Sequence, residues 1–411
     1  MRDLYNVKRS NIPMILMMFI IVVFGLVILY SVSGPAGYAM KTERDSTYYL
    51  SRQIIFTAVG IVICLAISFL PISLFNKPII WGGLYFLSLG LVIFTAAFGT
   101  ELNGARRWIK VTSTYNFQPS EVIKIALVIA FAGYRSWVLK IREKGGLKAP
   151  NPKRQVMKDA FFDFILPIGA AGLVDIFILF QPHTSCFLII GFVIFMCAVN
   201  AGIKPRSWLN GLGVALLVLI PAFLLYTQVI NPDWEKNFSH VSQRIEVYAS
   251  TSGDESVEVS DDETRQVTNA HNALGSGGMW GRGMGNSRAK YSYVSEAQND
   301  YIFSIYVEET GFVGGMILIL LYLVMFAMCV MVVMRANSIF SRMVATGCTS
   351  LLMIQVLLNI AVELQVIPAT GVTLPFISYG GTAQIFLLVA YGMILCVSRS
   401  GTSPKPVKEI P

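Results

Sequence analysis

The stretch SEAQNDYIFSIYVEETGFVGG, Ser295–Gly315, leads into an apolar run that continues to about residue 334. A helix needs about 20 apolar residues to cross a bilayer, so this run predicts a membrane-spanning helix and a fold built from such helices. Four carboxylates lie around its start: Glu296, Asp300, Glu308 and Glu309. Because an unpaired charge is costly at the edge of a bilayer, these groups are the first candidates for function.

The composition extends this interpretation to the whole chain. Of its 411 residues, 55% are hydrophobic and only 14% are charged, whereas a soluble protein carries roughly 25% charged residues. Apolar runs of spanning length occur ten times: at about 13–32, 53–72, 78–98, 119–138, 161–180, 184–202, 208–228, 303–334, 343–366 and 380–398. The first follows Lys8 and Arg9 but has no small-residue cleavage site, so we expect an uncleaved anchor. We predict an all-α, polytopic integral membrane protein with about ten spans, forming one domain over residues 1–411.

The basic residues of the loops predict the orientation. With the N-terminus in the cytoplasm, the inner segments hold 19 lysines and arginines and the outer segments hold 12, which agrees with the excess of positive charge on the inside. Both termini are then cytoplasmic, with a short tail at 399–411, and one large extracellular loop covers 229–300. The net charge of +8 therefore indicates topology and attraction to anionic membrane lipids, and no nucleic-acid partner is expected.

The cysteines and histidines suggest no metal site. All six cysteines lie in or at the edge of predicted spans and none has a CxxC partner, so we interpret them as packing residues. The histidines, at 183, 240 and 271, are too scattered to form a ligand cluster.

The large loop has two parts of different character. Its middle, STSGDESVEVSDDETRQ, is acidic and serine-rich, so we expect it to be solvated and flexible. Its end, NALGSGGMWGRGMGNSRAKYSYVSEAQND, is rich in glycine but lacks the spacing of a nucleotide-binding loop. These glycines would let the backbone turn tightly and approach a surface or a substrate. A flexible re-entry loop and a substrate-lining loop are both consistent with the sequence.

A cationic segment and a polar helix face lie close together in the sequence. The segment TELNGARRWIKVTSTYNFQPS, residues 100–120, places Arg106 and Arg107 on the predicted outer side. In QPSEVIK, Glu121 and Lys124 are three residues apart at the outer end of the fourth span, so they share a helix face and can pair. The pair is either structural or, with the arginines, part of a site for an anionic lipid headgroup such as a pyrophosphate. For Asp163 and Asp175, in the fifth span, we expect helix-end and interhelical hydrogen bonds.

Five ordered blocks of sequence resemble one family. They are NGARRWI with FQPSEVIK, FQPHTS, ALGSGGMWGRGMGNS, SEAQNDYIFSIYVEETGFVGG and IPATGVTLPFISYGGT. In this order they are similar to the signature blocks of the SEDS family of shape, elongation, division and sporulation proteins, which includes FtsW, RodA and SpoVE. The glycine-rich block with QND and the PFISYGGT ending look closer to FtsW and SpoVE than to RodA. The ten predicted spans agree with the topology of this family.

The resemblance implies a function and assigns residues to it. The family consists of peptidoglycan glycosyltransferases that polymerise lipid II at the outer face of the bacterial cytoplasmic membrane, usually with a class B penicillin-binding protein and other division or elongation proteins as partners. The essential acid of the family falls on Asp300, the polar pair of its cavity on Glu121 and Lys124, and its Arg-Trp element on Arg107 and Trp108. One departure is His183, which stands where the family commonly has an acid, so no obligatory carboxylate is expected there. The acidic segment 252–263 also differs from the loop usual in the family, which leaves partner contacts there open.

The chemistry of polymerisation explains why an acid is needed. A sugar hydroxyl is a poor nucleophile at neutral pH, so a positioned carboxylate must act as general base, and Asp300 is our candidate. Glu296 would orient Asp300 or the acceptor, whereas Glu308 and Glu309 are interpreted as packing or cavity residues. Arg106, Arg107 and Lys124 would stabilise the leaving pyrophosphate. The sequence identifies no certain cofactor, and a divalent cation, Mg²⁺ or Mn²⁺, is a further candidate for that role.

A lipid II flippase is the alternative function. In a flippase, Glu121, Lys124 and the arginines would line a translocation path that continues to the cytoplasmic side. The inner halves of the predicted spans look apolar apart from Asp163. The sequence therefore favours a polymerase, whose polar groups are needed only on the outer side.

Overall fold

The predicted spans form helices in a computed structural model of the chain, which describes residues 11–38, 45–102, 105–110, 112, 116–179, 181, 183–225, 239–251, 261–291 and 297–400. The apolar runs form helices because a bilayer offers no water to bond backbone N–H and C=O groups. Each segment must therefore satisfy these groups with hydrogen bonds of its own. Within the described ranges, eight helices are long and apolar enough to cross a membrane, and Thr184–Asn200 is a shorter apolar helix. The prediction of an all-α, polytopic membrane protein is confirmed.

The helices follow the predicted spans closely. They are α1 (Ile12–Tyr38), α2 (Tyr48–Phe69), α3 (Ile72–Phe75), α4 (Pro78–Phe98), α5 (Pro119–Glu143), α6 (Pro152–Ala160), α7 (Leu166–Leu179), α8 (Thr184–Asn200), α9 (Pro205–Leu225), α11 (Ser239–Thr251), α12 (Asp261–Ser276), α13 (Ile302–Met334), α14 (Ile339–Glu363) and α15 (Gly381–Arg399). A π-helical turn, Phe161–Ile165, joins α6 to α7. The seventh predicted span, 208–228, falls on α9, and its last three residues lie outside the described part of the chain.

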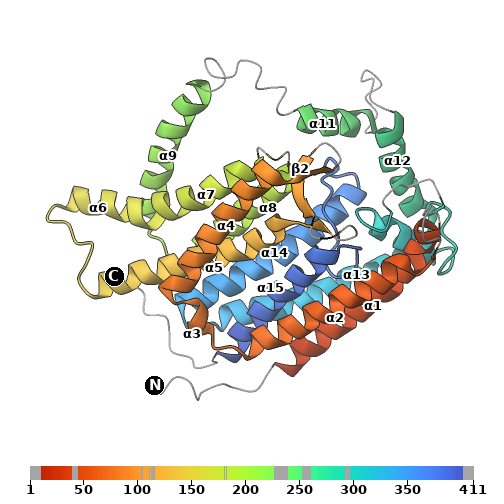
Figure 1. Ribbon diagram of the computed structural model, residues 1–411, viewed down its shortest axis with the longest axis horizontal. Coiled ribbons are helices and arrows are strands. Elements are labelled where there is room, and N and C mark those ends of the chain that lie inside the picture. Colours follow the sequence, from red (N-terminus) through yellow and green to blue (C-terminus); the bar gives the residue numbers. More distant parts are fainter. Residues whose placement is uncertain are drawn as a thin grey trace.

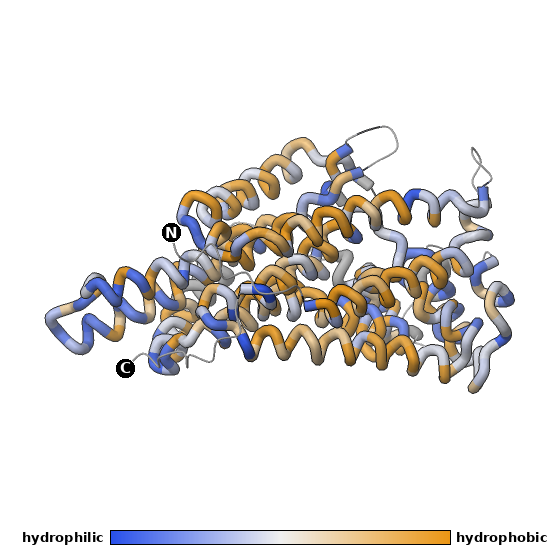
Figure 2. The backbone as a smooth tube through the Cα atoms, turned by 90° about the horizontal axis from the view of Figure 1, so that it is seen from below, coloured by the Kyte–Doolittle hydropathy of each residue, from blue (hydrophilic) through white to orange (hydrophobic). Residues whose placement is uncertain are grey.

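A small sheet forms where the sequence indicated only a cationic segment. Strands β1 (Thr100–Leu102), β2 (Ala105–Lys110) and β3 (Asn116–Phe117) pair antiparallel in the order β1-β2-β3. We call the end of the helical bundle that carries β2, α11 and α12 the sheet end, and α6 lies at the opposite end, the α6 end (Figure 1). The middle of the molecule is hydrophobic along its long helices, and hydrophilic residues gather towards the two ends (Figure 2).

The interior of the bundle is built on α5 and α14. In the most apolar 18-residue stretch of each helix, 78% of the residues of α5 and 72% of those of α14 are buried, against 17% for α4. Helix α14 packs on α5, α8, α13 and α15, which places it at the centre. Helices α2 and α4 therefore cover the outside, and the first turn of α5 begins inside the protein.

Helix α13 is interrupted at Gly311, whose φ of 72° and ψ of −174° are not helical. In an unbroken helix, the N–H groups of residues 312 and 313 would bond the carbonyls of residues 308 and 309. Instead, Phe312 and Val313 donate to carbonyls of Gly278 and Met279, and the carbonyls of Glu308 and Glu309 accept from the glycine-rich loop, at Arg282 and Gly283. The loop, residues 277–291, thus inserts its backbone into the break and satisfies the groups that the kink leaves free.

Glycine is required on both sides of this insertion. A β-carbon on Gly281 would lie 2.2 Å from the carbonyl oxygen of Glu309, and one on Gly311 would lie 2.4 Å from the nitrogen of Gly281. Both residues also have a positive φ, which disfavours any side chain. The close approach predicted for the glycine-rich loop is therefore an approach to α13 itself.

Candidate active site

The predicted pair on α5 is formed. Pro119 begins the helix, where a missing N–H costs nothing, and Glu121 and Lys124 follow on one face. Lys124 Nζ lies 2.8 Å from Glu121 Oε1, and the two side chains are 5% and 10% exposed. The pair thus lies inside the protein at the sheet end of α5.

Neighbouring residues of β2 differ in their exposure. Arg106 is exposed and forms a surface ion pair with Glu101, at 3.4 Å. Arg107 is partly buried, and burial together with the positive charge of Arg244 lowers its pKa, while the negative charge of Asp300 opposes that shift. Trp108 is partly buried, and its backbone carbonyl accepts a hydrogen bond from the Thr100 hydroxyl at 2.9 Å. Of the predicted Arg-Trp element, Arg107 is the residue electrostatically linked to Asp300.

Asp300 lies in the turn that precedes α13. Asn359 Nδ2 of α14 donates to the Asp300 carbonyl at 2.9 Å and to the Val372 carbonyl at the same distance. The Tyr379 N–H donates to the carbonyl of Gln298 in the same turn, at 2.9 Å. The backbone that presents Asp300 is therefore held by α14 and by the segment between α14 and α15. Glu296, predicted to lie one turn earlier, is outside the described residues.

His183 precedes α8 and borders this group. Burial, followed by the positive charges of Arg107, Lys124 and Arg244, lowers the pKa of His183 to about 3. Its Nδ1 is buried and has no hydrogen-bond partner among the residues that the structure describes. The histidine that replaces the family's acid is thus neutral, and it lies within electrostatic range of the cations around Asp300.

Arg244 also belongs to the charged group around Asp300, although the sequence did not indicate it as a site residue. It lies on α11, inside the predicted large loop, and its Nη1 donates to the Thr370 carbonyl at 3.4 Å. The same carbonyl accepts from the Ser185 hydroxyl at the start of α8. The only sequence signal was an amphipathic pattern in SHVSQRIEVYAST, and a surface helix would show the same pattern. The group therefore joins β2, α5, α8, α11 and the start of α13.

Glu308 and Glu309 serve packing, as predicted, by holding the glycine-rich loop. The Glu308 carboxylate accepts from the backbone of Arg288 and Ala289, at 3.1 and 3.3 Å, and Glu309 pairs with Lys290 at 2.7 Å. All three charged side chains, Glu308, Glu309 and Lys290, are buried. We call these contacts the loop clasp.

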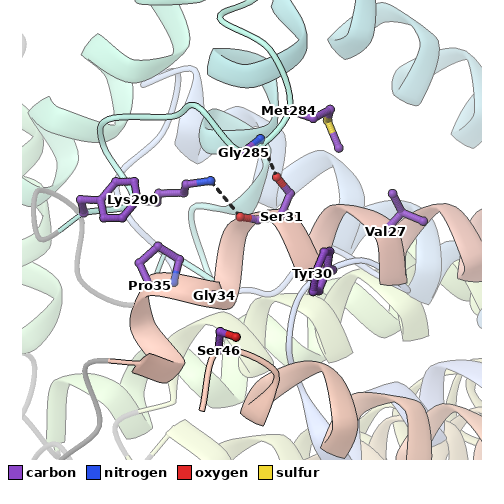
Figure 3. Close-up of a pocket in the computed structure, with 10 residues that line it drawn as sticks. Val27, Tyr30, Ser31, Gly34, Pro35, Ser46, Met284, Gly285 and Lys290 are labelled. Atoms are coloured by element: carbon purple, nitrogen blue, oxygen red, sulfur yellow. Dashed lines mark hydrogen bonds between the residues drawn. The ribbon is translucent and has the colours of Figure 1, made fainter. Parts of the chain in front are cut away.

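A pocket of about 520 Å³ lies beside the clasp, between α1 and the glycine-rich loop. Figure 3 shows Lys290 and Gly285 donating to the backbone and side-chain oxygens of Ser31 on its wall, both at 3.0 Å. The ammonium of Lys290 is already paired with Glu309, so the pocket offers no uncompensated cation to an anion. None of its lining residues belongs to the Asp300 group, which we therefore take as the candidate active site.

The cation suggested from the sequence has no complete set of ligands here. Across the described ranges, no group of three or more His, Cys, Asp and Glu side chains converges in a way that could hold a metal ion. A metal site built by the protein alone does not fit these residues, and no step below depends on one.

A second buried ionic group lies at the α6 end. Asp163, in the π-helical turn, pairs with Arg135 and Arg142 of α5, and Arg135 also donates to the carbonyls of Ala201 and Gly202. The predicted interhelical bonding of Asp163 is confirmed. The prediction that the inner halves were apolar apart from Asp163 is wrong, because Arg135 and Arg142 approach the same group from the end of α5.

These features define a class of protein: a multi-pass helical membrane protein that gathers Asp300, Arg107, Arg244 and the Glu121–Lys124 pair at the sheet end of the bundle. The family model for FtsW, RodA and SpoVE, described as cell cycle protein, matches residues 11–403. The chain belongs to this family.

Individual relatives are similar in sequence to this chain over nearly its whole length. The chain is 31% identical over 397 residues to a probable peptidoglycan glycosyltransferase FtsW from Geobacter sulfurreducens, covering 96% of both proteins. It is 28% identical to stage V sporulation protein E of Bacillus subtilis, covering 95% of this chain and 97% of that protein. The predicted similarity to FtsW and SpoVE is thereby confirmed.

Two solved structures share the fold. A chain from a peptidoglycan synthase complex superposes with a TM-score of 0.67 at 24% identity, covering 95% of this chain and 98% of the other. The rod shape determining protein RodA of Thermus thermophilus gives a TM-score of 0.62 at 23% identity, covering 96% and 98%. At these identities the similarity concerns the fold.

Proposed function

We infer that this chain is a peptidoglycan glycosyltransferase that polymerises lipid II into glycan strands. Family membership supports the reaction class, because relatives such as the Geobacter protein carry this activity in their names. The observation that carries the site assignment is the grouping of Asp300 with Arg107 and Arg244. The positive charge of Arg244 is close enough to Arg107 to lower its pKa, and the negative charge of Asp300 acts on the same guanidinium group in the opposite direction. Two neighbouring, partly buried positive charges favour an anion beside them, and a pyrophosphate is such an anion.

The proposed reaction joins two lipid-linked molecules. Asp300 takes the proton of the 4-hydroxyl of the acceptor sugar, and the resulting oxygen attacks C1 of the donor sugar. A new glycosidic bond forms between these atoms as the bond from C1 to the pyrophosphate oxygen breaks. The lipid diphosphate leaves with its electron pair, and the carboxyl group of Asp300 later returns the proton to water.

The cations have different proposed parts in this step. Arg107 and Arg244 hold the pyrophosphate through charge-assisted, bidentate hydrogen bonds, which guanidinium groups make well. The Glu121–Lys124 pair is already satisfied at 2.8 Å, so its part is to shape the polar wall below the donor. Arg106 is paired with Glu101 on the surface, so we assign it a weaker part in holding the leaving group than Arg107. Trp108 and Glu296 remain proposed substrate contacts.

The cellular setting follows from the sequence and the family. We propose the bacterial cytoplasmic membrane, with both termini cytoplasmic, the sheet end outside, the large loop at 229–300 and the tail at 399–411. The proposed partner is a class B penicillin-binding protein, since one structure with this fold comes from a peptidoglycan synthase complex. A cysteine placed at 252–263 should react with an impermeant thiol reagent on cells stripped of an outer membrane. One placed at 143–153 should not, and the reverse pattern would overturn this orientation.

The flippase alternative needs a polar path between the two ends of the bundle. Helix α5 carries charged groups at both ends, Lys124 and Arg135, but the stretch between them, IALVIAFAG at 125–133, is apolar and buried. The group around Asp163 is also closed by its own ion pairs. This separation favours a polymerase, whose chemistry is confined to one end.

The deciding experiment is reconstitution of the purified protein with lipid II, with and without a class B penicillin-binding protein, followed by separation of glycan strands by length. We expect strands that depend on Asp300. Transport of lipid II across the vesicle membrane without strand formation would support the flippase instead.

A further inference from the structure

Helix α13 begins at Ile302, one residue beyond the neighbour of Asp300, and no side chain at its own cap position caps it. The first N–H groups of a helix have no partner within the helix. The residue at the cap position is Tyr301, whose side chain forms no capping hydrogen bond. The orientation of this first turn decides where the Asp300 side chain points, because the two are separated by one residue.

The missing cap is supplied by another helix. Glu363, the last residue of α14, accepts hydrogen bonds from the N–H of Phe303 at 3.3 Å and from the N–H of Ser304. Its side chain is buried, at 2% exposure. Carboxyl oxygens at a helix N-terminus can accept hydrogen bonds from these orphan donors.

One turn earlier on α14, Asn359 bonds the carbonyl of Asp300 itself, at 2.9 Å. The last turn of α14 therefore forms hydrogen bonds with the backbone at Asp300 and at Phe303–Ser304. The charge of Asp300 acts electrostatically on the Glu363 carboxyl group, so the two groups lie in the same region of the protein. Glu363 carries no functional signal in the sequence because it lies at the end of an apolar span, more than 60 residues beyond Asp300. In the fold it bonds the first turn of the helix that follows Asp300.

We propose that Glu363 is a positioning residue for the reaction: by capping α13 from α14, it fixes the direction in which Asp300 presents its carboxylate to the acceptor hydroxyl. This inference rests on the proposed role of Asp300. Glu363 touches neither sugar nor pyrophosphate in this account, and it acts only through Asp300.

The test compares Glu363→Ala, Glu363→Gln and the control Glu143→Ala in the full-length protein reconstituted with lipid II. Glu143 is also the last residue of a helix, α5, but it is exposed. Glu363→Ala is expected to lower kcat on the order of 10- to 100-fold, with KM for lipid II changed less than about threefold, because misplacement of a catalytic group acts on the chemical step. Glu363→Gln keeps one acceptor oxygen and should restore part of kcat, and Glu143→Ala should behave like the wild type.

A double variant separates positioning from general damage. If Glu363 acts through Asp300, Glu363→Ala should have no further effect on the residual rate of Asp300→Asn. Amide hydrogen exchange at residues 302–305 should become faster in Glu363→Ala, and this readout does not depend on activity. An unchanged kcat in Glu363→Ala, or a full additional loss in the double variant, would overturn the inference. Wild-type activity of Asp300→Asn alone would instead overturn the proposed role of Asp300.

Discussion

Gly371 lies against the carboxyl group of Asp300: a β-carbon built on Gly371 would be 3.5 Å from Asp300 Oδ2. Gly371 also has a φ of +66°, a conformation that costs other residues roughly 1–2 kcal/mol. The neighbouring carbonyls of Thr370 and Val372 accept hydrogen bonds from Arg244 and Asn359. The backbone at 370–372 thus packs against the side chain of the proposed base.

Gly371→Ala should therefore impair polymerisation more than folding. The new methyl group has room at 3.5 Å, but the positive φ will push residues 370–372 away from their present positions and displace Asp300 with them. We expect kcat to fall about tenfold or more, measured as lipid II consumption in proteoliposomes. Gly83→Ala, on α4, is the control because a β-carbon there meets nothing within 4 Å. Equal rates in the two variants would show that the backbone at 370–372 does not position Asp300.

Arg106 and Arg107 provide a matched pair for the pyrophosphate role. Arg107→Ala removes a partly buried guanidinium linked to Asp300, and lipid II binding should weaken about tenfold or more, the value of a hydrogen bond to a charged group. Arg106→Ala removes an exposed partner of Glu101, and such surface pairs contribute little. Binding is measured in the Asp300→Asn background, where turnover is expected to be slow. Comparable losses in both variants would count against a specific site at Arg107.

The sequence could not have separated these two arginines. Which of them faces the site depends on the register of β2, and the strand itself was not predicted, because two to six residues between long spans give no periodic signal. The spans were predictable since a bilayer demands about 20 apolar residues from each. Their contacts were not predictable. Asn359 reaches Asp300, and Glu363 reaches the first turn of α13, only through the packing of α14 on α13, which composition does not encode. The Glu121–Lys124 pair was predictable because both members lie on one helix turn.

The loop clasp should carry much of the local stability of the glycine-rich loop. Lys290→Met leaves Glu309 buried without its ammonium partner, and breaking a buried ion pair costs about 3–5 kcal/mol. We expect a clear drop in melting temperature in detergent, whereas Lys144→Met, at an exposed position, should have little effect. Adding Glu309→Gln to Lys290→Met should recover part of the loss, because the uncompensated charge is gone. A melting temperature equal to that of the wild type for Lys290→Met would show that the clasp contributes no stability.

The lowered pKa of His183 leads us to expect that the stability of the folded protein depends on pH. Its pKa is lowered from the ordinary value of 6.5 to about 3 in the folded protein. Between these values the unfolded chain binds a proton that the folded protein does not, so stability rises with pH across this window. The contribution is fully present above about pH 6.5 and is lost as the pH falls towards 3.

The corresponding variant is His183→Gln, compared with His271→Gln at an exposed position on α12. Melting temperatures measured from pH 7 down to pH 4 should fall less steeply for His183→Gln than for the wild type. His271→Gln should follow the wild-type slope. The same slope in all three proteins would mean that His183 takes up a proton in the folded state, contrary to its lowered pKa.

The role of Asp300 is tested by Asp300→Asn, which keeps the size of the side chain and most of its hydrogen bonding but removes the basic site. Because Asn359 holds residue 300 through its backbone carbonyl, the variant should fold, insert and bind lipid II normally. Polymerisation should fall about 10²-fold or more, the usual contribution of a general base. The measurement is strand formation in proteoliposomes, with Asp45→Asn as a control because Asp45 is exposed and its carboxylate accepts hydrogen bonds from its near neighbour Thr47. If a well-folded Asp300→Asn protein polymerised lipid II at nearly the normal rate, the proton would have to go elsewhere. Glu296 would then be the next carboxylate to change.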